Sequence, residues 1–307
     1  MRIAVLGSGG VGGYFGGRLA LAGEHVTFIA RGEHLKVLRT TGLKVDSIDG
    51  NFLIHPAKAT AEPREVGPVD LVVLGVKAWQ VPEAARAMKP MVGPETTVLP
   101  LQNGVDAALQ LAAELGHEPV IGGLCKIVSC LVEPGHIRHA GFEPSVMFGE
   151  LDNRRTDRIE NIHAAFTHAG VKAAIASDIQ VALWTKLLFI AAFSGVGALR
   201  RTPAGALRSD PETRSLLLQA MEEIYALAHA RGIALPEDSV EKAIASVDSL
   251  PADGTSSMQR DIAAGKPSEL EAQNGAVVRM ARESGVEVPT HEFIYGKLAL
   301  LEMKARG

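Results

Sequence analysis

The feature that most constrains the fold is a glycine-rich segment near the start of the chain, Gly-Ser-Gly-Gly-Val-Gly at residues 7–12. An apolar run at residues 2–6 precedes it, and a segment with helical spacing follows it. In the spacing G-x-G-x-x-G, Gly7 permits a tight turn, Gly9 lets the backbone approach a pyrophosphate, and Gly12 lets helix pack on strand. The phosphates would meet unpaired amides at the positive end of the helix. Although glycine-rich turns are common, this strand–turn–helix context predicts a dinucleotide-binding loop formed by Gly7, Ser8, Gly9, Gly10, Val11 and Gly12.

The first half of the chain alternates strand-like and helical segments. Further apolar runs lie at 25–31, 69–77 and 97–104, and they are continuous rather than alternating. Such runs are typical of strands covered on both faces. Repeated strand–helix–strand units predict an α/β fold, a Rossmann-type, doubly wound parallel sheet with right-handed crossovers. Short strand-like runs at 120–149 are candidates to extend this sheet.

From about residue 179 the pattern becomes helical. Glycine- and proline-containing breakers separate the expected helices, which span 179–199, 211–231, 237–248, 256–264, 269–284 and 290–304. We therefore predict two domains, a dinucleotide-binding Rossmann domain at 1–176 and an all-helical substrate and catalytic domain at 177–307.

Charge and cysteine content narrow the class of protein. Thirty-one basic and 35 acidic side chains give a net charge of −4 with no dense basic run, which argues against a nucleic-acid surface. Cys125 and Cys130 are too few for a disulfide framework and lack further ligands for zinc. The N-terminus does not resemble a signal peptide, and the apolar run at 187–199 is too short to span a membrane. We expect a cytoplasmic protein with no metal and no membrane partner.

The end of the second predicted strand bears on the choice of cofactor. NAD enzymes usually place an acidic residue there to bind the ribose 2′-hydroxyl, whereas this chain has Arg31. A guanidinium suits a 2′-phosphate, which favours NADPH/NADP⁺. The alternative is a surface arginine, with Glu33 serving NAD.

Two polar residues follow later predicted strands. Lys77 comes after the apolar run at 71–76, and Asn103 comes after the run at 97–101. Ligands of open α/β sheets bind at the carboxyl ends of strands, so both are candidates for the cofactor site. The alternatives are a solvated lysine and an Asn-Gly turn.

Lys186 lies in the middle of the apolar helical segment Ala-Leu-Trp-Thr-Lys-Leu-Leu-Phe-Ile-Ala-Ala-Phe-Ser-Gly at 182–195. Reduction of a carbonyl by a nicotinamide cofactor leaves negative charge on oxygen, so a proton donor must be near. A desolvated lysine opposite a carboxylate can fill that role. The alternative is a lysine whose stem packs while its head reaches water.

The segment at 255–274 offers a partner. Thr255, Ser256 and Ser257 resemble a helix start, and Ser268 with Glu271 has capping-box spacing. Glu269 lies in that first turn, where acidic residues are also favoured by the helix dipole alone. Ser257 could likewise serve only as a cap. The spacing of these residues in the sequence does not show whether Lys186 and Glu269 lie close together in the fold.

Taken together, these motifs resemble the ketopantoate reductase (2-dehydropantoate 2-reductase) family over nearly the whole chain. The segments that carry the resemblance are RIAVLGSGGVGGYFGGRLA, VKAWQ, LQNGV, LWTKLL and SSMQRDIAAGKPSELEAQNG. Their order and spacing match the family as well as their composition.

The resemblance implies a Rossmann domain that binds NADPH, a helical domain and an active site in the cleft. Lys186 would protonate the ketone oxygen, and Glu269 would orient substrate or cofactor and interact with that lysine. Asn103 would contact nicotinamide and substrate, and Ser257 would bind the substrate carboxylate. Arg31 and Lys77 would bind the phosphate and ribose region of the cofactor. The implied reaction is reduction of 2-dehydropantoate to pantoate, on the route to pantothenate and coenzyme A, by a monomer or homodimer.

The chain departs from the family's pattern at its usual asparagines. Ile190 and Ser194 stand four and eight residues after Lys186, at positions near the same helical face, and Ala204 and Gly254 replace two more asparagines. Two alternatives follow. One is a reductase of the same mechanism for a more apolar branched 2-oxo acid, with Ile190 and Ser194 in the substrate pocket. The other is a non-catalytic NADP(H)-responsive regulator, which would not need a general acid.

Overall fold

A parallel five-stranded sheet forms the centre of the first half of the chain. The computed structural model describes residues 1–307, and all neighbouring strands of this sheet run parallel in the order β5-β2-β1-β6-β7. This is the predicted Rossmann-type arrangement. Its strands are β1 (Arg2–Leu6), β2 (His25–Ile29), β5 (Ala59–Thr60), β6 (Leu71–Leu74) and β7 (Thr97–Pro100).

Helices cover both faces of the sheet, because the side chains of its strands are apolar on both sides. One core joins β1 and β6 to α3 and α4, while another joins β1 and β2 to α1, α5 and β9. The helices are α1 (Gly10–Leu21), α2 (Gly32–Thr40), α3 (Val81–Met88), α4 (Ala107–Leu115) and α5 (Asp157–His168), with the short turns η1 (Pro63–Glu65), η2 (Ala78–Gln80) and η3 (Lys89–Met91).

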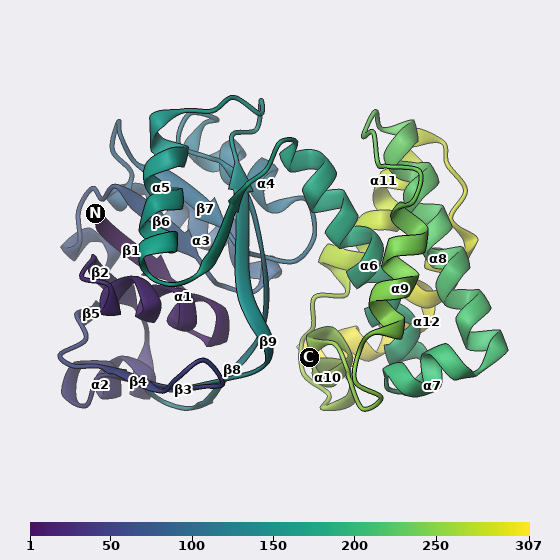
Figure 1. The fold of residues 1–307 in the computed structure, drawn as a ribbon, viewed down its shortest axis with the longest axis horizontal. Helices are drawn as coiled ribbons and strands as arrows, with labels where there is room; N and C mark the ends of the chain where they lie inside the picture. The colour runs from purple at the N-terminus through teal and green to yellow at the C-terminus, as the bar shows by residue number, and fades with distance from the viewer. The chain divides into compact units, whose positions relative to one another are not determined.

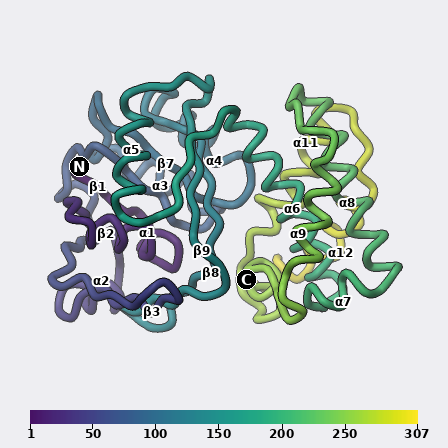
Figure 2. The backbone as a smooth tube through the Cα atoms, in the orientation of Figure 1, coloured from purple at the N-terminus to yellow at the C-terminus, as the bar shows by residue number.

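The prediction that residues 120–149 extend the parallel sheet is wrong except for a single bridge between Val98 and Val120. Instead, β8 and β9 form a long antiparallel hairpin whose two arms run side by side (Figures 1 and 2). The hairpin belongs to a second sheet, ordered β10-β9-β3-β4, because β9 pairs on its other side with β3 and β10. These strands are β3 (Leu43–Ser47), β4 (Phe52–Ile54), β8 (Gly122–Glu133), β9 (His136–Gly149) and β10 (Lys172–Ile175).

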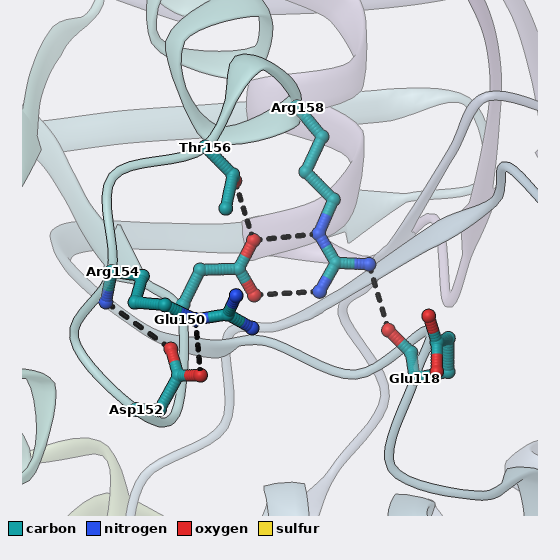
Figure 3. A network of polar contacts seen from close by, with 6 residues as sticks. All are labelled: Glu118, Glu150, Asp152, Arg154, Thr156 and Arg158. Atoms are coloured by element: carbon teal, nitrogen blue, oxygen red, sulfur yellow. Dashed lines mark hydrogen bonds and ion pairs between the residues drawn. The ribbon is translucent and has the colours of Figure 1, made fainter.

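An ion pair between a buried carboxylate, Glu150, and a half-buried arginine, Arg158, closes the loop between β9 and α5 (Figure 3). The Glu150 carboxylate accepts hydrogen bonds from Arg158 at 2.7 and 2.6 Å and from the Thr156 hydroxyl at 2.6 Å. Arg158 also donates to the carbonyl of Glu118 at 2.7 Å. Burial opposes ionisation of Glu150, but the bonds from Arg158 and Thr156 outweigh it, so the pKa of this carboxyl is lowered.

The remaining helices form a second compact unit. The backbone groups into Met1–Gln102 with Ala107–Ile179, and Asn103–Asp106 with Gln180–Gly307. The helices of the second unit, shown from green to yellow in Figure 1, are α6 (Ile179–Arg200), α7 (Ala204–Ser209), α8 (Pro211–Ala230), α9 (Ser239–Asp248), α10 (Ser257–Ala263), a π-helical turn η4 (Glu271–Gly275), α11 (Ala276–Ser284) and α12 (Pro289–Arg306). Whether 1–176 and 177–307 fold as separate domains stays a prediction, which limited proteolysis would test.

The helical pattern of the sequence predicts this unit well, with two differences. The segment around Pro203, expected as a breaker, begins the short helix α7, because proline is compatible with a helix start. The expected capping box of Ser268 and Glu271 does not form, since the Ser268 hydroxyl donates to Glu302 and Glu271 accepts from Arg279 and Tyr295.

Helix α6 is the one helix whose length and composition would allow it to cross a membrane. Of its apolar window, 67% is buried inside the protein. Part of this helix lies in the core of the second unit, together with α8, α9, α11 and α12. Its core side chains are Trp184, Leu187, Leu188, Ala191, Ala192, Phe193, Val196 and Ala198. A core helix of a folded unit accounts for this apolar run.

Candidate active site

The loop after β1 has a conformation that only glycine fits at two positions. Gly7 has φ +93°, and a Cβ there would lie 2.5 Å from the amide nitrogen of Val76 in the loop after β6. A Cβ at Gly12 would lie 2.2 Å from the carbonyl oxygen of Gly7. A Cβ on Gly9 would instead meet nothing within 4 Å. The loop is thus closely packed at Gly7 and Gly12 and open beside Gly9. A pyrophosphate would approach the start of α1 on this open side.

Neighbouring side chains fix the backbone of this loop. Ser8 is buried, its hydroxyl lies 3.3 Å from the carbonyl of Ile29, and its own carbonyl lies 2.9 Å from Nε2 of His34. Because the amide of Gly135 donates to Nδ1 of His34 at 2.9 Å, Nε2 carries the proton and donates to Ser8. Burial lowers the pKa of His34, in keeping with this neutral ring. His34 therefore ties the glycine loop to the β8–β9 hairpin.

The remaining loop residues lie at the first turn of α1. Gly10 begins the helix, and a Cβ there would lie 2.7 Å from the carbonyl oxygen of Ser129 on β8. Val11 is half-buried beside the core shared by α1 and β9. No side chain caps this helix, so its first amides are available to an anion.

Arg31 is exposed at the residue before α2. It lies 3.7 Å from Glu83, in a pair whose side chains are 76% and 65% exposed, so this contact is weak. Arg31 also lines an open hollow whose other charged residues are Arg64 on η1, Arg86 on α3 and Glu62. Glu33 lies beside Lys36 at 3.5 Å on the exposed surface of α2.

Lys77 follows β6, and Gln102, the residue before Asn103, bonds to the backbone at the end of that strand and just before Lys77. Lys77 precedes η2, and its ammonium lies 5.8 Å from the ring centre of Trp79. The amide of Gln102 donates to the carbonyls of Leu74 and Val76, at 2.8 and 3.0 Å. Gln102 thereby fixes the loop that packs on Gly7. Sequence reasoning missed Gln102, although a glutamine next to a buried strand is a signal of a required hydrogen bond.

The segment Asn103–Asp106 follows β7 but packs within the second unit. The side-chain amide of Asn103 donates to Oε2 of Glu269 at 2.9 Å. Gly104 has φ +96°, and a Cβ there would lie 2.5 Å from the carbonyl oxygen of Ala272. Asp106 accepts a hydrogen bond from Arg279. Asn103 and Glu269, which are 166 residues apart, are therefore brought together.

The two serines at the start of α10 have different roles. Ser256 is the N-cap, and its hydroxyl accepts from the amide of Gln259 at 3.1 Å. Ser257 is the first residue of the helix and is half-buried. The capping role, one of the two interpretations of Ser257, thus belongs to Ser256, and the hydroxyl of Ser257 is not needed for it.

Helix α6 carries Lys186, Ile190 and Ser194 at successive turns. Lys186 and Ile190 are half-buried, whereas Ser194 is completely buried and its hydroxyl has no hydrogen-bond partner. The side-chain amide of Asn274 donates to the carbonyl of Ala191 at 3.1 Å. Lys186 lies five residues before Ala191 in the sequence, and Glu269 lies five residues before Asn274. This hydrogen bond therefore joins the two segments of chain that carry Lys186 and Glu269.

The fold and the open glycine loop are typical of dinucleotide-binding oxidoreductases. Two family models match the chain, "Ketopantoate reductase PanE/ApbA" over residues 3–153 and its C-terminal counterpart over residues 178–302. The chain belongs to the ketopantoate reductase family.

Individual proteins agree with this assignment. An uncharacterized oxidoreductase YkpB of Bacillus subtilis is 32% identical, covering 98% of this chain and 99% of that protein. The 2-dehydropantoate 2-reductase of Halobacterium salinarum is 33% identical, covering 94% and 95%. A PanE/ApbA family ketopantoate reductase from Ralstonia eutropha JMP134 has a solved structure that is 32% identical, covers 100% of both chains and gives a TM-score of 0.91.

Proposed function

We propose that the protein reduces 2-dehydropantoate to pantoate with NADPH, on the route to pantothenate and coenzyme A in the cytoplasm. The observation that carries the proposal is the hydrogen bond of 2.9 Å between Asn103 and Glu269. It unites two residues that the family resemblance assigns to one site, from segments far apart in the sequence. The proposal treats the protein as a monomer or homodimer.

The reaction adds a hydride to the ketone carbon and a proton to the ketone oxygen. The nicotinamide cofactor supplies the hydride, and the open glycine loop suits its pyrophosphate. The protein must supply the proton and hold the substrate beside the cofactor. In this proposal Lys186 donates the proton from Nζ to the oxygen as the carbon is reduced. The product is the 2-hydroxy acid, and a proton from solvent restores the ammonium group.

The other residues have supporting roles. Glu269 orients the substrate and favours the charged form of Lys186 through its negative charge. Asn103, oriented by its bond to Glu269, contacts nicotinamide and substrate. Ser257, whose hydroxyl is not the helix cap, binds the substrate carboxylate.

NADPH is proposed over NADH because of the charge around Arg31. A hollow lined by three arginines, Arg31, Arg64 and Arg86, against one carboxylate, Glu62, suits a doubly charged 2′-phosphate better than a hydroxyl. Lys77, which follows the strand next to β1, would contact the ribose and phosphate region. Glu33, the residue that would serve NAD, lies on the exposed side of α2 beside Lys36.

A second candidate is a reductase of the same mechanism that acts on a more apolar branched 2-oxo acid. Ala204 and Gly254, two positions where the family has asparagine, are hydrogen-bonded neighbours at 2.9 Å. Ile190 replaces a third amide one turn after Lys186, and Ser194 replaces a fourth in a completely buried position. The lost amides therefore include an adjacent pair, which favours a substrate with fewer polar groups.

The test is oxidation of NADPH by the purified protein across a panel of 2-oxo acids. The proposal expects the highest kcat/KM with 2-dehydropantoate. The second candidate expects a maximum with an acid that lacks the hydroxyl. A protein that binds NADPH but reduces none of the acids would instead fit the non-catalytic regulator.

A further inference from the structure

Helix α12 holds the residue immediately before Glu269 by a buried carboxylate. Both oxygens of Glu302 accept from the backbone amide of Ser268, at 3.0 and 3.1 Å, and Oε2 accepts from its hydroxyl at 2.6 Å. Ser268 is completely buried, and Glu302 is 8% exposed. The contact joins residues 34 positions apart.

A second side chain of α12 completes the arrangement. Arg306 forms an ion pair of 2.6 Å with Glu302 and donates to the carbonyl of Ser268 at 3.2 Å. The hydroxyl of Ser268 in turn accepts from the amide of Leu270 at 3.3 Å. Every polar atom of Ser268 is thus held by a partner, and Leu270 lies on the other side of Glu269.

The capping box that the sequence suggests does not fix this turn. The sequence suggests a capping box of Ser268 with Glu271, but the carboxylate of Glu271 binds Arg279 at 3.0 Å and Tyr295 at 2.6 Å. Glu269 is 6% exposed, and its carboxylate meets Asn103. The side chains from outside this turn that hold Ser268, the residue before Glu269, therefore come from α12.

We propose that Glu302 is a positioning residue of the reductase, acting through Ser268 to aim the carboxylate of Glu269. This rests on the proposed function, in which Glu269 orients the substrate and acts on Lys186. A displacement of about 1 Å in a catalytic group can cost as much as 10²-fold in rate. Loss of the charged acceptor of the buried Ser268 amide and hydroxyl is a strong reason for such a turn to shift.

The test is Glu302→Gln, which keeps the shape but places an amide NH₂ where one of the two oxygens accepts. We expect kcat to fall by about tenfold to hundredfold while the KM for NADPH changes little. The matched control is Glu223→Gln. Glu223 is a comparably buried carboxylate, since its side chain is 11% exposed and that of Glu302 is 10% exposed. It accepts from two backbone amides at the other end of α12. The Glu223→Gln variant should lose stability as the Glu302→Gln variant does, but its kcat should stay at the wild-type value.

A double-mutant comparison separates positioning from stability. If Glu302 acts only through Glu269, Glu302→Gln should have no further effect on kcat in a Glu269→Gln background. Multiplied effects in the double variant, an equal loss of kcat in Glu223→Gln, or full kcat in Glu302→Gln would each overturn the inference. Full kcat in Glu269→Gln would instead overturn the assigned role of Glu269 in the proposed function.

A milder variant covers the case in which Glu302→Gln does not fold, as judged by circular dichroism. Arg306→Gln removes the bond to the Ser268 carbonyl and the ion pair, and its side chain is 38% exposed. We expect a smaller fall in kcat, again absent in the Glu269→Gln background. A fall that persists in that background would contradict the inference.

Discussion

The glycine loop of the first unit, at residues 7–12, and the side-chain site of the second unit, formed by Asn103 and Glu269, are built in different ways. In the first, one run of residues at 7–12 makes the loop, and the steric demands of Gly7 and Gly12 fix its backbone. In the second, Asn103 and Glu269 come from distant segments and bond to each other, and side chains of other elements bond to the nearby residues Asp106 and Ser268. A site made of backbone amides can thus be recognised from local sequence, whereas a site made of side chains depends on tertiary packing.

The largest effect should come from Lys186, the proposed proton donor. If Lys186 donates the proton, Lys186→Ala should lower turnover by about 10²- to 10⁴-fold, because the oxygen would then lack its proton donor. Binding of NADPH, which we assign to the glycine loop of the first unit, should change little. Stopped-flow or steady-state reduction assays measure the first quantity, and a fluorescence titration measures the second.

Lys297→Ala is the control for loss of a helical lysine. Lys297 lies on the exposed face of α12, 5.7 Å from the ring centre of Phe293, and its loss should leave turnover unchanged. Full turnover in a folded Lys186→Ala variant would show that Lys186 only packs its stem and extends its head to water.

The same contrast explains which parts of the fold can be predicted from the sequence alone. The four strands β1, β2, β6 and β7 and most helices follow from continuous apolar runs and helical periodicity, which are local signals. The second sheet was missed, because β9 finds its partners in β3 and β10, far away along the chain. Strand pairing of this kind leaves no trace in either strand by itself.

The candidate site divides along the same line. Residues 7–12 and Arg31 are suggested by spacing within one strand–helix–strand unit. Nothing in the spacing of Ser268 reveals that its partner is Glu302, and the capping-box pattern favoured a closer, incorrect partner. Gln102 and His34 were missed because their roles depend on backbone carbonyls and amides of other loops.

A second prediction separates scaffold from site within the first unit. Glu150→Gln should lower the free energy of unfolding by about 2 kcal/mol, because it removes a charged acceptor from Arg158. The kcat measured well below the melting temperature should stay the same. A fall in kcat without a fall in melting temperature would contradict this view of the loop as scaffold.

The pH dependence of that stability has a defined sign. The pKa of Glu150 is lower in the folded protein than its ordinary value of 4.5. Its contribution is therefore complete above the unfolded pKa and is lost as pH falls through the folded pKa. The difference in melting temperature between the wild type and Glu150→Gln should be constant from about pH 6 to 8 and shrink below about pH 4.5.

A third prediction concerns the cofactor loop. NADPH should be preferred over NADH by at least about tenfold, or 1.4 kcal/mol, a modest demand on charge-assisted contacts to a 2′-phosphate. Arg31→Ala should raise the KM for NADPH and barely alter that for NADH. Arg154→Ala, which removes an arginine that is also 76% exposed, should alter neither. Equal use of both cofactors by the wild type would defeat the assignment of Arg31.

The smallest effect should be in substrate choice, where the side-chain site departs most from its family. Ile190 is half-buried one turn after Lys186, at a position where the family has an amide. A site built to bind a hydroxyl rejects analogues without it, because its own polar groups are then left unpaired. Isoleucine cannot make that bond, and each buried methylene of a substrate contributes about 0.8 kcal/mol. We therefore expect weak selectivity for 2-dehydropantoate over its deoxy analogue, 2-oxo-3,3-dimethylbutanoate.

Ile190→Asn should shift the ratio of kcat/KM for these two acids toward 2-dehydropantoate, because the new amide can bind the hydroxyl. The shift requires partners for the amide, since an unpaired buried amide would lower stability instead, and a melting curve distinguishes the two results. The reverse argument applies to the wild type. If it already prefers 2-dehydropantoate by about a thousandfold, equivalent to about 4 kcal/mol, then other residues supply the contacts that the missing amides provide elsewhere in the family. Residues at other positions of the chain would then bind the substrate hydroxyl in place of the family's asparagines. Local sequence cannot reveal such positions, although the specificity would be the same as in the rest of the family.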